Sequence, residues 1–334
     1  MLNNKSILIT GGTGSFGSTY LEYCLKKYKK IKKIVIFSRD ELKQFNLKEK
    51  YSNTPKFFEK IRFLLGDVRD LDRIKFAFKD IDYVVHAAAL KQVESAEYNP
   101  LEVIKTNILG AQNIIDAAIY NKVKKVIALS TDKASSPINL YGATKLCSDK
   151  LFLSSNNIIG SRDLSFSVVR YGNVLGSRGS VVPEFIKQNK SKEFKITDKN
   201  MTRFNILLAD GVKLVDTVLK KSVGGEIFVP KMSSYRLMDL AKAISSTNKI
   251  KIIGIRPGEK IHEDILTNQD ARSTYDLKDY YVLLNDNKKL ESYYAKKFKA
   301  KKVPPDFYYN SGSNKKFLTI NEIKFILKKN NFIN

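Results

Sequence analysis

The stretch ILITGGTGSFGSTYLEYCL, residues 7–25, carries the strongest indication of the fold. It runs from an apolar, strand-like segment through the spaced glycines Gly11, Gly14 and Gly17 into a segment with helical spacing. Such glycines let the backbone turn tightly and approach a pyrophosphate, whose charge is favoured at a helix N-terminus. Because the pattern lies between the first strand and the first helix, it predicts a dinucleotide-binding loop. The alternative is a structural glycine turn.

Apolar runs of strand length recur after this stretch and alternate with segments of helical spacing. The runs are SILIT, KIVIFS, IRFLLGD, DYVVHAA, KVIALS and LSFSVVRYGN, and the helical segments include Thr19–Tyr28, Leu71–Lys79 and Leu101–Asn121. This alternation predicts a parallel sheet with helices on both faces, which is the doubly wound α/β fold.

The rhythm changes after Asn173 to mixed short elements, which predicts a dinucleotide-binding domain over residues 1–172 and a mainly substrate-binding region over 173–334. GGEIFVP, residues 224–230, is predicted to be a strand that returns to the first domain. RLMDLAKAIS reads as a helix, and KIKIIGIRPGEKIHEDIL as a strand, a turn and a helix start. A further helix is expected near Ile320–Lys329. The second region should close over the carboxyl ends of the strands, where α/β sheets bind ligands.

The composition is that of a globular protein with a strong basic excess, a formal net charge of +25. The lysines are spread along the chain without a nucleic-acid-binding motif, so solvated helix faces explain them better than nucleic-acid binding, and they can attract a small polyanionic substrate. No run of about 18 uncharged apolar residues is present, so we expect a soluble, cytoplasmic protein. Cys24 and Cys147 lack metal-ligand spacing and are expected to be buried thiols.

The second apolar run ends in Ser38, Arg39 and Asp40. An acid at that strand end would bind a ribose 2′-hydroxyl and favour NAD, whereas a hydroxyl and a guanidinium suit the 2′-phosphate of NADP. We predict NADP on the basis of Ser38 and Arg39 at the strand end, with NAD as the alternative that the neighbouring Asp40 keeps open. His86, at the end of the fourth run, is expected to be a hydrogen-bonded core histidine.

Tyr141 and Lys145 are four residues apart, which places both side chains on one face of a helix. A nearby ammonium and a nicotinamide cation would stabilise the phenolate, so Tyr141 can accept a proton from an alcohol as hydride leaves its carbon. The alternative is a partly exposed helical pair.

With these motifs, the sequence resembles the extended short-chain dehydrogenase/reductase family, which acts chiefly on nucleotide sugars. The resemblance rests on GGTGSFG, HAAA, Asn107 in KTNILGA, LSTDK, YGATK and RYGNVLGSRGS. Retaining 4,6-dehydratases of that family carry aspartate and then glutamate after the threonine, whereas this chain has Thr131, Asp132 and Lys133. That substitution, with SRDE and RPGEK, resembles the inverting UDP-N-acetylglucosamine 4,6-dehydratases, which begin pseudaminic acid biosynthesis in bacteria.

The resemblance implies a reaction and its catalytic residues. Tyr141 would be the base for oxidation at carbon 4 of the sugar, and Lys145 would hold the nicotinamide ribose. Asp132 would protonate the departing carbon 6 hydroxyl, and Thr131 would bind the carbon 4 oxygen. Lys133 would remove the carbon 5 proton, return it, or do both by way of water. As a base it must be neutral, which desolvation or the positive charge of Lys145 and the nicotinamide could bring about.

Two further sets of residues are expected to line the site. The cofactor set comprises Gly11, Thr13, Gly14, Ser15, Phe16, Gly17, Ser38, Arg39, Asp40, Lys43, Asp67, Val68, Ala87, Ala88, Ala89, Asn107, Tyr141, Lys145 and Val174. The set for UDP-N-acetylglucosamine comprises Lys91, Asn173, Arg178, Arg203, Arg256 and Glu259. Guanidinium groups suit phosphate oxygens bidentately, although any one arginine could instead form a surface salt bridge. His262 and Glu263 do not make a metal site.

Two other functions use the same motifs. A nucleotide-sugar 4-epimerase or 4-reductase shares the glycine loop and the Tyr141–Lys145 pair but needs no acid and base at carbons 5 and 6. A non-catalytic NADP-binding regulator needs none of the catalytic groups. Apolar helices at Leu101–Asn121 and Tyr141–Leu153 predict at least a homodimer, with a hexamer as the larger alternative.

Overall fold

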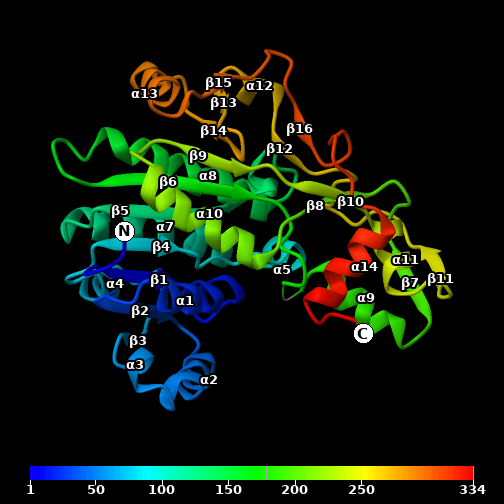
Figure 1. The fold of residues 1–334 in the computed structure, drawn as a ribbon, viewed down its shortest axis with the longest axis horizontal. Coiled ribbons are helices and arrows are strands. Elements are labelled where there is room, and N and C mark those ends of the chain that lie inside the picture. Colours follow the sequence, from blue (N-terminus) through cyan, green and yellow to red (C-terminus); the bar gives the residue numbers. More distant parts are fainter. Residues whose placement is uncertain (178, 334) are drawn as a thin grey trace.

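A large, mostly parallel sheet forms the centre of the computed structural model, which describes residues 1–177 and 179–333 (Figure 1). Its parallel strands lie in the order β3 (Ile61–Leu65), β2 (Lys33–Ser38), β1 (Ser6–Thr10), β4 (Tyr83–His86), β5 (Lys125–Thr131), β6 (Ser165–Tyr171) and β9 (Ile227–Pro230). The order reverses between β1 and β4, where doubly wound sheets bind ligands. The predicted doubly wound fold is confirmed.

Helices cover both faces of this sheet. On one face α1 (Ser15–Lys27) packs against α10 (Leu208–Lys221), and on the other α7 (Gly110–Tyr120) contacts both α4 (Leu71–Ala77) and α8 (Leu140–Ser154). The remaining elements of this part are α2 (Glu41–Ser52), α3 (Pro55–Phe58), α5 (Val93–Tyr98), α6 (Pro100–Ile104) and short 3₁₀ turns at Asp132–Ala134 and Ser155–Asn157.

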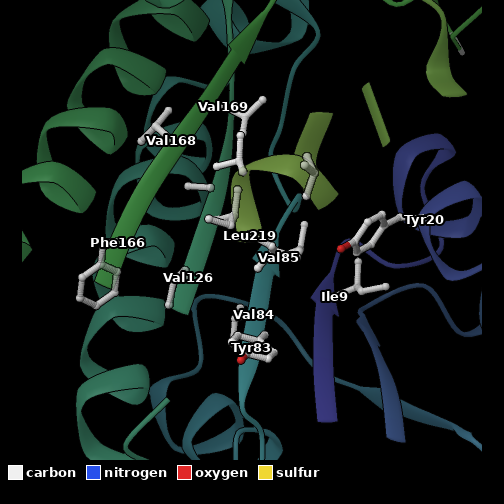
Figure 2. Packing of buried hydrophobic residues seen from close by; sticks show 14 of the residues in the cluster. Ile9, Tyr20, Tyr83, Val84, Val85, Val126, Phe166, Val168, Val169 and Leu219 are labelled. Carbon is white, nitrogen blue, oxygen red and sulfur yellow. The ribbon is translucent and has the colours of Figure 1, made fainter. Parts of the chain in front are cut away.

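The core lies between the sheet and these helices. Every residue of β1 and β6 is buried, as expected for strands covered on both faces. Figure 2 shows Ile9, Val85 and Val126 of the strands packed with Tyr20 from α1 and Leu219 from α10. These contacts fix the carboxyl ends of the strands, on which the site is built.

The expected helix over Leu101–Asn121 is interrupted. Its middle, Lys105–Leu109, is a π-helical segment that buries Thr106 and Asn107. Such single-turn π segments often occur at functional sites. The segment turns Asn107 toward the neighbouring loop and helix.

Residues beyond 172 divide between two parts of the molecule. Besides β9, the strands β14 (Tyr280–Leu283), β13 (Thr274–Asp276) and β15 (Lys301–Lys302) extend the large sheet in antiparallel fashion, and α12 (Asn268–Ala271) and α13 (Lys288–Phe298) accompany them. The sequence predicted the return of the 224–230 strand alone. The added strands cover an edge of β9 that would otherwise expose unpaired backbone groups.

A smaller lobe carries its own core. It contains the strand pairs β7 (Glu193–Ile196) with β11 (Lys249–Ile252) and β8 (Thr202–Asn205) with β10 (Ser233–Arg236), together with α9 (Val181–Asn189), α11 (Leu237–Ile244) and α14 (Ile320–Lys329). Phe185, Phe194 and Leu240 are among its buried residues. A further pair, β12 (Asp264–Leu266) with β16 (Tyr309–Asn310), buries Ile265, Leu266 and Tyr309 in the core of the large sheet. The helix start predicted near residue 264 is wrong, because the chain there pairs as β12 with β16.

Candidate active site

A cleft of about 1700 Å³ runs between the carboxyl ends of the large sheet and the smaller lobe. The catalytic set Thr131, Asp132, Lys133, Tyr141 and Lys145 lines it, as does the predicted cofactor set apart from Asn107. Lys91, Asn173, Arg203, Arg256 and Glu259 line it too, whereas Arg178 lies outside the described residues. The fold therefore brings almost all the predicted groups into one site.

The glycine loop fits a dinucleotide. Gly11 has φ +62°, and a Cβ there would lie 2.9 Å from backbone atoms of Ala87 and Ala88. A Cβ at Gly17 would lie 2.5 Å from the Cα of Gly12, so this close backbone packing admits only glycine. The first turn of α1 has no acidic side chain, which leaves the helix N-terminus favourable for an anion.

Arg39 and Asp40, the two residues that the sequence predicts to decide between NADP and NAD, lie in different environments at the end of β2. Asp40 caps α2 by accepting a hydrogen bond from Lys43 N at 2.9 Å, and it also pairs with the Lys43 ammonium. Arg39 lies half-exposed at the cleft, with Nη1 3.6 Å from Oδ2 of Asp67. The carboxylate is thus engaged at a helix start, while the guanidinium lies beside Asp67 at the cleft.

Tyr141 and Lys145 occupy the first turns of α8, whose N-cap Asn139 accepts a hydrogen bond from Gly142 N at 2.8 Å. Burial raises the pKa of Tyr141 to about 12, against the opposing effects of Lys133 and of a hydrogen bond with Thr131. Burial lowers the pKa of Lys145, which is 3% exposed, and Asp149 opposes that shift. Tyr141 therefore needs additional positive charge nearby before it can ionise near neutral pH.

Asn107, which was expected to contact the cofactor, is not among the residues that line the cleft. Its Oδ1 accepts from Leu90 N at 2.9 Å, and its Nδ2 donates to Leu90 O at 2.9 Å and to Thr144 Oγ1 at 3.0 Å. It therefore braces the loop after β4 against α8. His86 is a core residue as expected, bonded through Nδ1 to Thr10 Oγ1 at 2.8 Å, and burial lowers its pKa to about 3.

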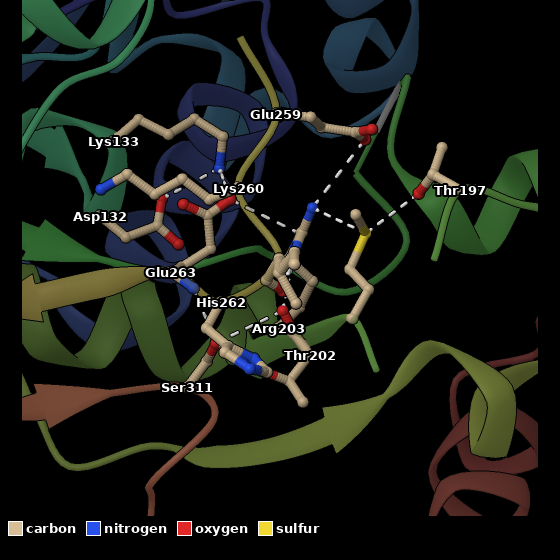
Figure 3. A network of polar contacts seen from close by, with 12 residues as sticks. Asp132, Lys133, Thr197, Thr202, Arg203, Glu259, Lys260, His262, Glu263 and Ser311 are labelled. Atoms are coloured by element: carbon tan, nitrogen blue, oxygen red, sulfur yellow. Dashed lines mark hydrogen bonds and ion pairs between the residues drawn. The ribbon is translucent and has the colours of Figure 1, made fainter. Parts of the chain in front are cut away.

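Asp132 and Lys133 sit in a network of charges that the sequence did not reveal (Figure 3). Lys133 Nζ lies 3.2 Å from Asp132 Oδ1 and 2.8 Å from Glu263 Oε1. Glu263 is 2% exposed and also lies 3.5 Å from Nε of Arg203. Burial alone would lower the pKa of Lys133, but the two carboxylates outweigh it and raise that pKa. The two carboxylates therefore favour the charged form of Lys133 in this arrangement.

The two carboxyl groups shift in opposite directions. Burial raises the pKa of Asp132, with Lys133 opposing, as suits a proton donor. Burial would also raise the pKa of Glu263, but Lys133 and Arg203 together lower it. The surroundings therefore favour the protonated acid at Asp132 and the ionised carboxylate at Glu263 within one site.

The substrate side of the cleft is polar. Asn173 Oδ1 is buried without a hydrogen-bond partner among the described residues, so it can accept a hydrogen bond from a ligand or from water in the cleft. Burial, with Lys133 nearby, lowers the pKa of Lys91. Besides Glu263, sequence reasoning missed the lining residues Gln92, Lys195, Thr197 and Lys260. The sequence around Gln92, Lys195 and Thr197 carries no distinguishing pattern, whereas Lys260 is the last residue of the RPGEK motif.

The structure also bears on metal-binding clusters, membrane-spanning helices and the two cysteines. Among residues 1–177 and 179–333, no cluster of His, Cys, Asp and Glu could hold a metal ion. Across the same residues, no helix has the length and apolarity needed to cross a membrane. Cys24 is buried as expected, but Cys147 is exposed, because it lies on the outer side of α8.

The doubly wound sheet, the glycine loop and the Tyr141–Lys145 pair define an extended short-chain dehydrogenase/reductase. A family model described as polysaccharide biosynthesis protein matches residues 7–285, and the chain belongs to that family.

Two curated relatives and one crystal structure illustrate the similarity. A UDP-N-acetylglucosamine 4,6-dehydratase (inverting) of Campylobacter jejuni strain 81-176 is 51% identical over 98% of both chains. A protein named UDP-glucose 4-epimerase, of Rickettsia bellii strain OSU 85-389, is 45% identical over 98% of this chain and 96% of its own. The X-ray structure of Pen from Bacillus thuringiensis superposes with a TM-score of 0.90 at 37% identity, covering 100% of both chains.

Proposed function

We propose that this protein is an inverting UDP-N-acetylglucosamine 4,6-dehydratase. The product would be UDP-2-acetamido-2,6-dideoxy-β-L-arabino-hex-4-ulose, and the reaction would open pseudaminic acid biosynthesis. The observation that carries the proposal is that Asp132, Lys133 and Glu263 line the same cleft as Tyr141 and Lys145. Simple 4-epimerisation needs only the tyrosine and lysine.

The cofactor we propose is NADP. The glycine loop would hold its pyrophosphate, and Ser38 with Arg39 would bind its 2′-phosphate, since Asp40 is engaged in capping α2. When bound, the nicotinamide supplies the hydride acceptor for carbon 4 and the later hydride donor for carbon 6. Its positive charge would add to that of Lys145 in favouring the phenolate of Tyr141.

The chain's own groups would handle the protons. Tyr141 would accept the proton of the carbon 4 hydroxyl, beside Thr131. The resulting ketone makes the carbon 5 proton removable. Asp132, whose pKa burial raises, would protonate the carbon 6 hydroxyl as it leaves as water.

Lys133 would take part in removing or returning the proton at carbon 5. As it stands between two carboxylates it carries a proton that it can return to carbon 5. It can act as the base there only after it passes its proton to a neighbouring carboxylate. Because Lys133 reaches only one face of the ring, water would carry the proton on the other face, and return on the face opposite to removal inverts the configuration.

The test is incubation with UDP-N-acetylglucosamine and catalytic NADP in deuterated water, followed by NMR and mass spectrometry. We expect loss of water, a 4-keto-6-deoxy sugar, deuterium at carbon 5 and the L-arabino configuration. The name of the Rickettsia relative makes 4-epimerisation the alternative. That activity would give a carbon 4 epimer of unchanged mass without deuterium at carbon 5.

We further propose a homodimer in which the α6–α7 and α8 helices of two subunits pack together. Leu101, Leu109 and Tyr120 on this flank are 59%, 52% and 70% exposed in the single chain. A larger assembly such as a hexamer would need a second contact. Light scattering at micromolar concentration distinguishes monomer, dimer and hexamer.

A further inference from the structure

Charges of alternating sign form a chain across the floor of the cleft (Figure 3). Glu259 Oε1 lies 3.9 Å from Nη2 of Arg203, and Nε of Arg203 lies 3.5 Å from Glu263 Oε1. The same Oε1 atom lies 2.8 Å from Lys133 Nζ, which in turn lies 3.2 Å from Asp132 Oδ1. Glu263 is therefore the link between the arginine expected to meet the diphosphate and the lysine expected to act at carbon 5.

The fold holds Glu263 firmly in this place. Its backbone N donates to Ser311 Oγ at 2.8 Å, and Ser311 N donates to Glu263 O at 2.9 Å. Ser311 Oγ is also 2.8 Å from Thr202 Oγ1 on β8, next to Arg203. These contacts tie the start of β12 to β8 and β16. The backbone contacts of Glu263 with Ser311 thereby hold its side chain in position to contact Lys133.

The other oxygen of Glu263 reinforces this interpretation. Oε2 is buried and has no hydrogen-bond partner among the described residues. A buried carboxylate with one unsatisfied oxygen is costly unless strong charges compensate it, and here Lys133 and Arg203 both lie near Oε1. Packing alone does not require a carboxylate at this position, because an apolar side chain of that size fills the space without the cost of burying a charge.

We propose that Glu263 is a positioning residue for the dehydration: it fixes the position and the positive charge of Lys133 and couples them to Arg203. This deepens the proposed function and rests on it for the role of Lys133. The charged and titratable groups that face Lys133 come from several elements: Asp132 on the 3₁₀ turn, Glu263 before β12, Arg203 on β8, Tyr235 on β10, Tyr141 on α8 and Lys91 after β4.

The groups around Lys133 determine in which direction its pKa moves when the charge of Glu263 is removed. Asp132 and Glu263 favour the ammonium form of Lys133, whereas burial and Arg203 disfavour it. Without the charge of Glu263, only Asp132 still raises the pKa of Lys133, while burial and Arg203 continue to lower it. The pKa of Lys133 must then fall, and an opposite charge at hydrogen-bond distance shifts a pKa by about 1–3 units.

The experiment compares Glu263→Gln with Glu259→Gln in the full-length protein. Both variants replace a carboxylate near Arg203 by an isosteric amide, but only Glu263 contacts Lys133. Lysines are reductively methylated with ¹³C and titrated by NMR, and the Lys133 signal is identified by its loss in Lys133→Arg. We expect the pKa of Lys133 to fall by about one unit or more in Glu263→Gln. In Glu259→Gln it should stay at the parent value.

Kinetics supply the second measurement. In Glu263→Gln the alkaline limb of the pH profile of kcat/KM should move to lower pH, and kcat should fall by about tenfold or more at neutral pH. Glu259→Gln should chiefly raise KM. An unchanged Lys133 pKa and an unmoved limb in Glu263→Gln would overturn the proposal, even if activity fell.

The titration needs no substrate, so it separates two failures. If the protein does not dehydrate UDP-N-acetylglucosamine but the Lys133 pKa still falls in Glu263→Gln, the proposed function fails and the control of Lys133 by Glu263 holds. If Glu263→Gln does not fold, Glu263→Asp, which keeps the charge but shortens the side chain, takes its place. A Lys133 pKa in Glu263→Asp equal to that of the parent, with parental kcat, would contradict a dependence on position.

Discussion

The ring of Phe332 lies directly over the Cα of Gly176, so any side chain at position 176 would overlap it. Gly176 has φ +71°, a conformation that glycine adopts without strain. It belongs to the loop after β6 that also carries Asn173. The chain reaches this position because α14 ends in a left-handed Asn331, with Phe332 N donating to Leu327 O at 2.9 Å. The segment that follows α14 thus packs against the loop that carries Asn173 at the cleft.

Phe332→Ala should weaken substrate binding more than it affects catalysis. Loss of the ring frees the loop around Gly176, and a contact worth about 1.4 kcal/mol corresponds to a tenfold change in affinity. We expect KM for the nucleotide sugar to rise by about tenfold, with kcat and NADP affinity near their parent values. Phe325→Ala, which removes a 65% exposed ring from α14, the helix that precedes Phe332, is the control. Equal KM values in the two variants would show that Phe332 does not hold the loop.

Asp149→Asn should destabilise the fold through a buried ion pair. Nη2 of Arg170 lies 3.1 Å from Asp149 Oδ2, both side chains are buried, and Ser130 Oγ donates to the same oxygen at 2.7 Å. Removing one partner of such a pair costs about 3 kcal/mol, because a charge is left uncompensated. Urea unfolding measures the loss. The double variant Asp149→Leu/Arg170→Met should recover most of it, and a double variant less stable than Asp149→Asn would refute this account.

Arg39→Ala should reduce affinity for NADP far more than affinity for NAD. The guanidinium at the end of β2 is half-exposed and is proposed to meet the 2′-phosphate, and a hydrogen bond to a charged group contributes about 1.5–3 kcal/mol. Calorimetric titration should therefore show at least about a tenfold loss for NADP. Arg62→Ala, at an exposed arginine on β3, serves as the control. Equal losses for both dinucleotides would argue against 2′-phosphate recognition by Arg39.

Lys133→Glu should stop dehydration without preventing cofactor binding. The new carboxylate would stand beside Asp132 and Glu263, and three neighbouring carboxylates cannot all ionise at low cost. We expect turnover to fall by roughly 10²-fold or more, the scale for a positioned acid-base group. NADP affinity should be retained, because Lys133 lies outside the glycine loop.

Lys133→Met separates loss of the amine from gain of an anion. It should also lose turnover, but it should unfold at higher urea than Lys133→Glu because it adds no third charge. Parental turnover and stereochemistry in Lys133→Glu would show that Lys133 has no role at carbon 5.

The sequence by itself determined the features that depend on near neighbours along the chain. Strand and helix alternation, the glycine loop at residues 11–17 and the Tyr141–Lys145 pair each follow from spacings of a few residues, since backbone geometry repeats over such distances. The same local information placed Asp132 and Lys133 at the end of β5. It also identified the family through motifs carried by these segments.

Only the tertiary structure decided how these groups are charged and braced. Lys133 meets Glu263 across 130 positions of sequence, and Asn107 turns from the cleft because a π segment orients it toward Leu90 and Thr144. Phe332 reaches Gly176 through the packing of α14 on the smaller lobe. Such contacts arise from the path of the whole chain, and burial then multiplies their electrostatic effect because little water remains to screen the charges. A local pattern of residues reveals neither the path of the chain nor how deeply each charged group is buried.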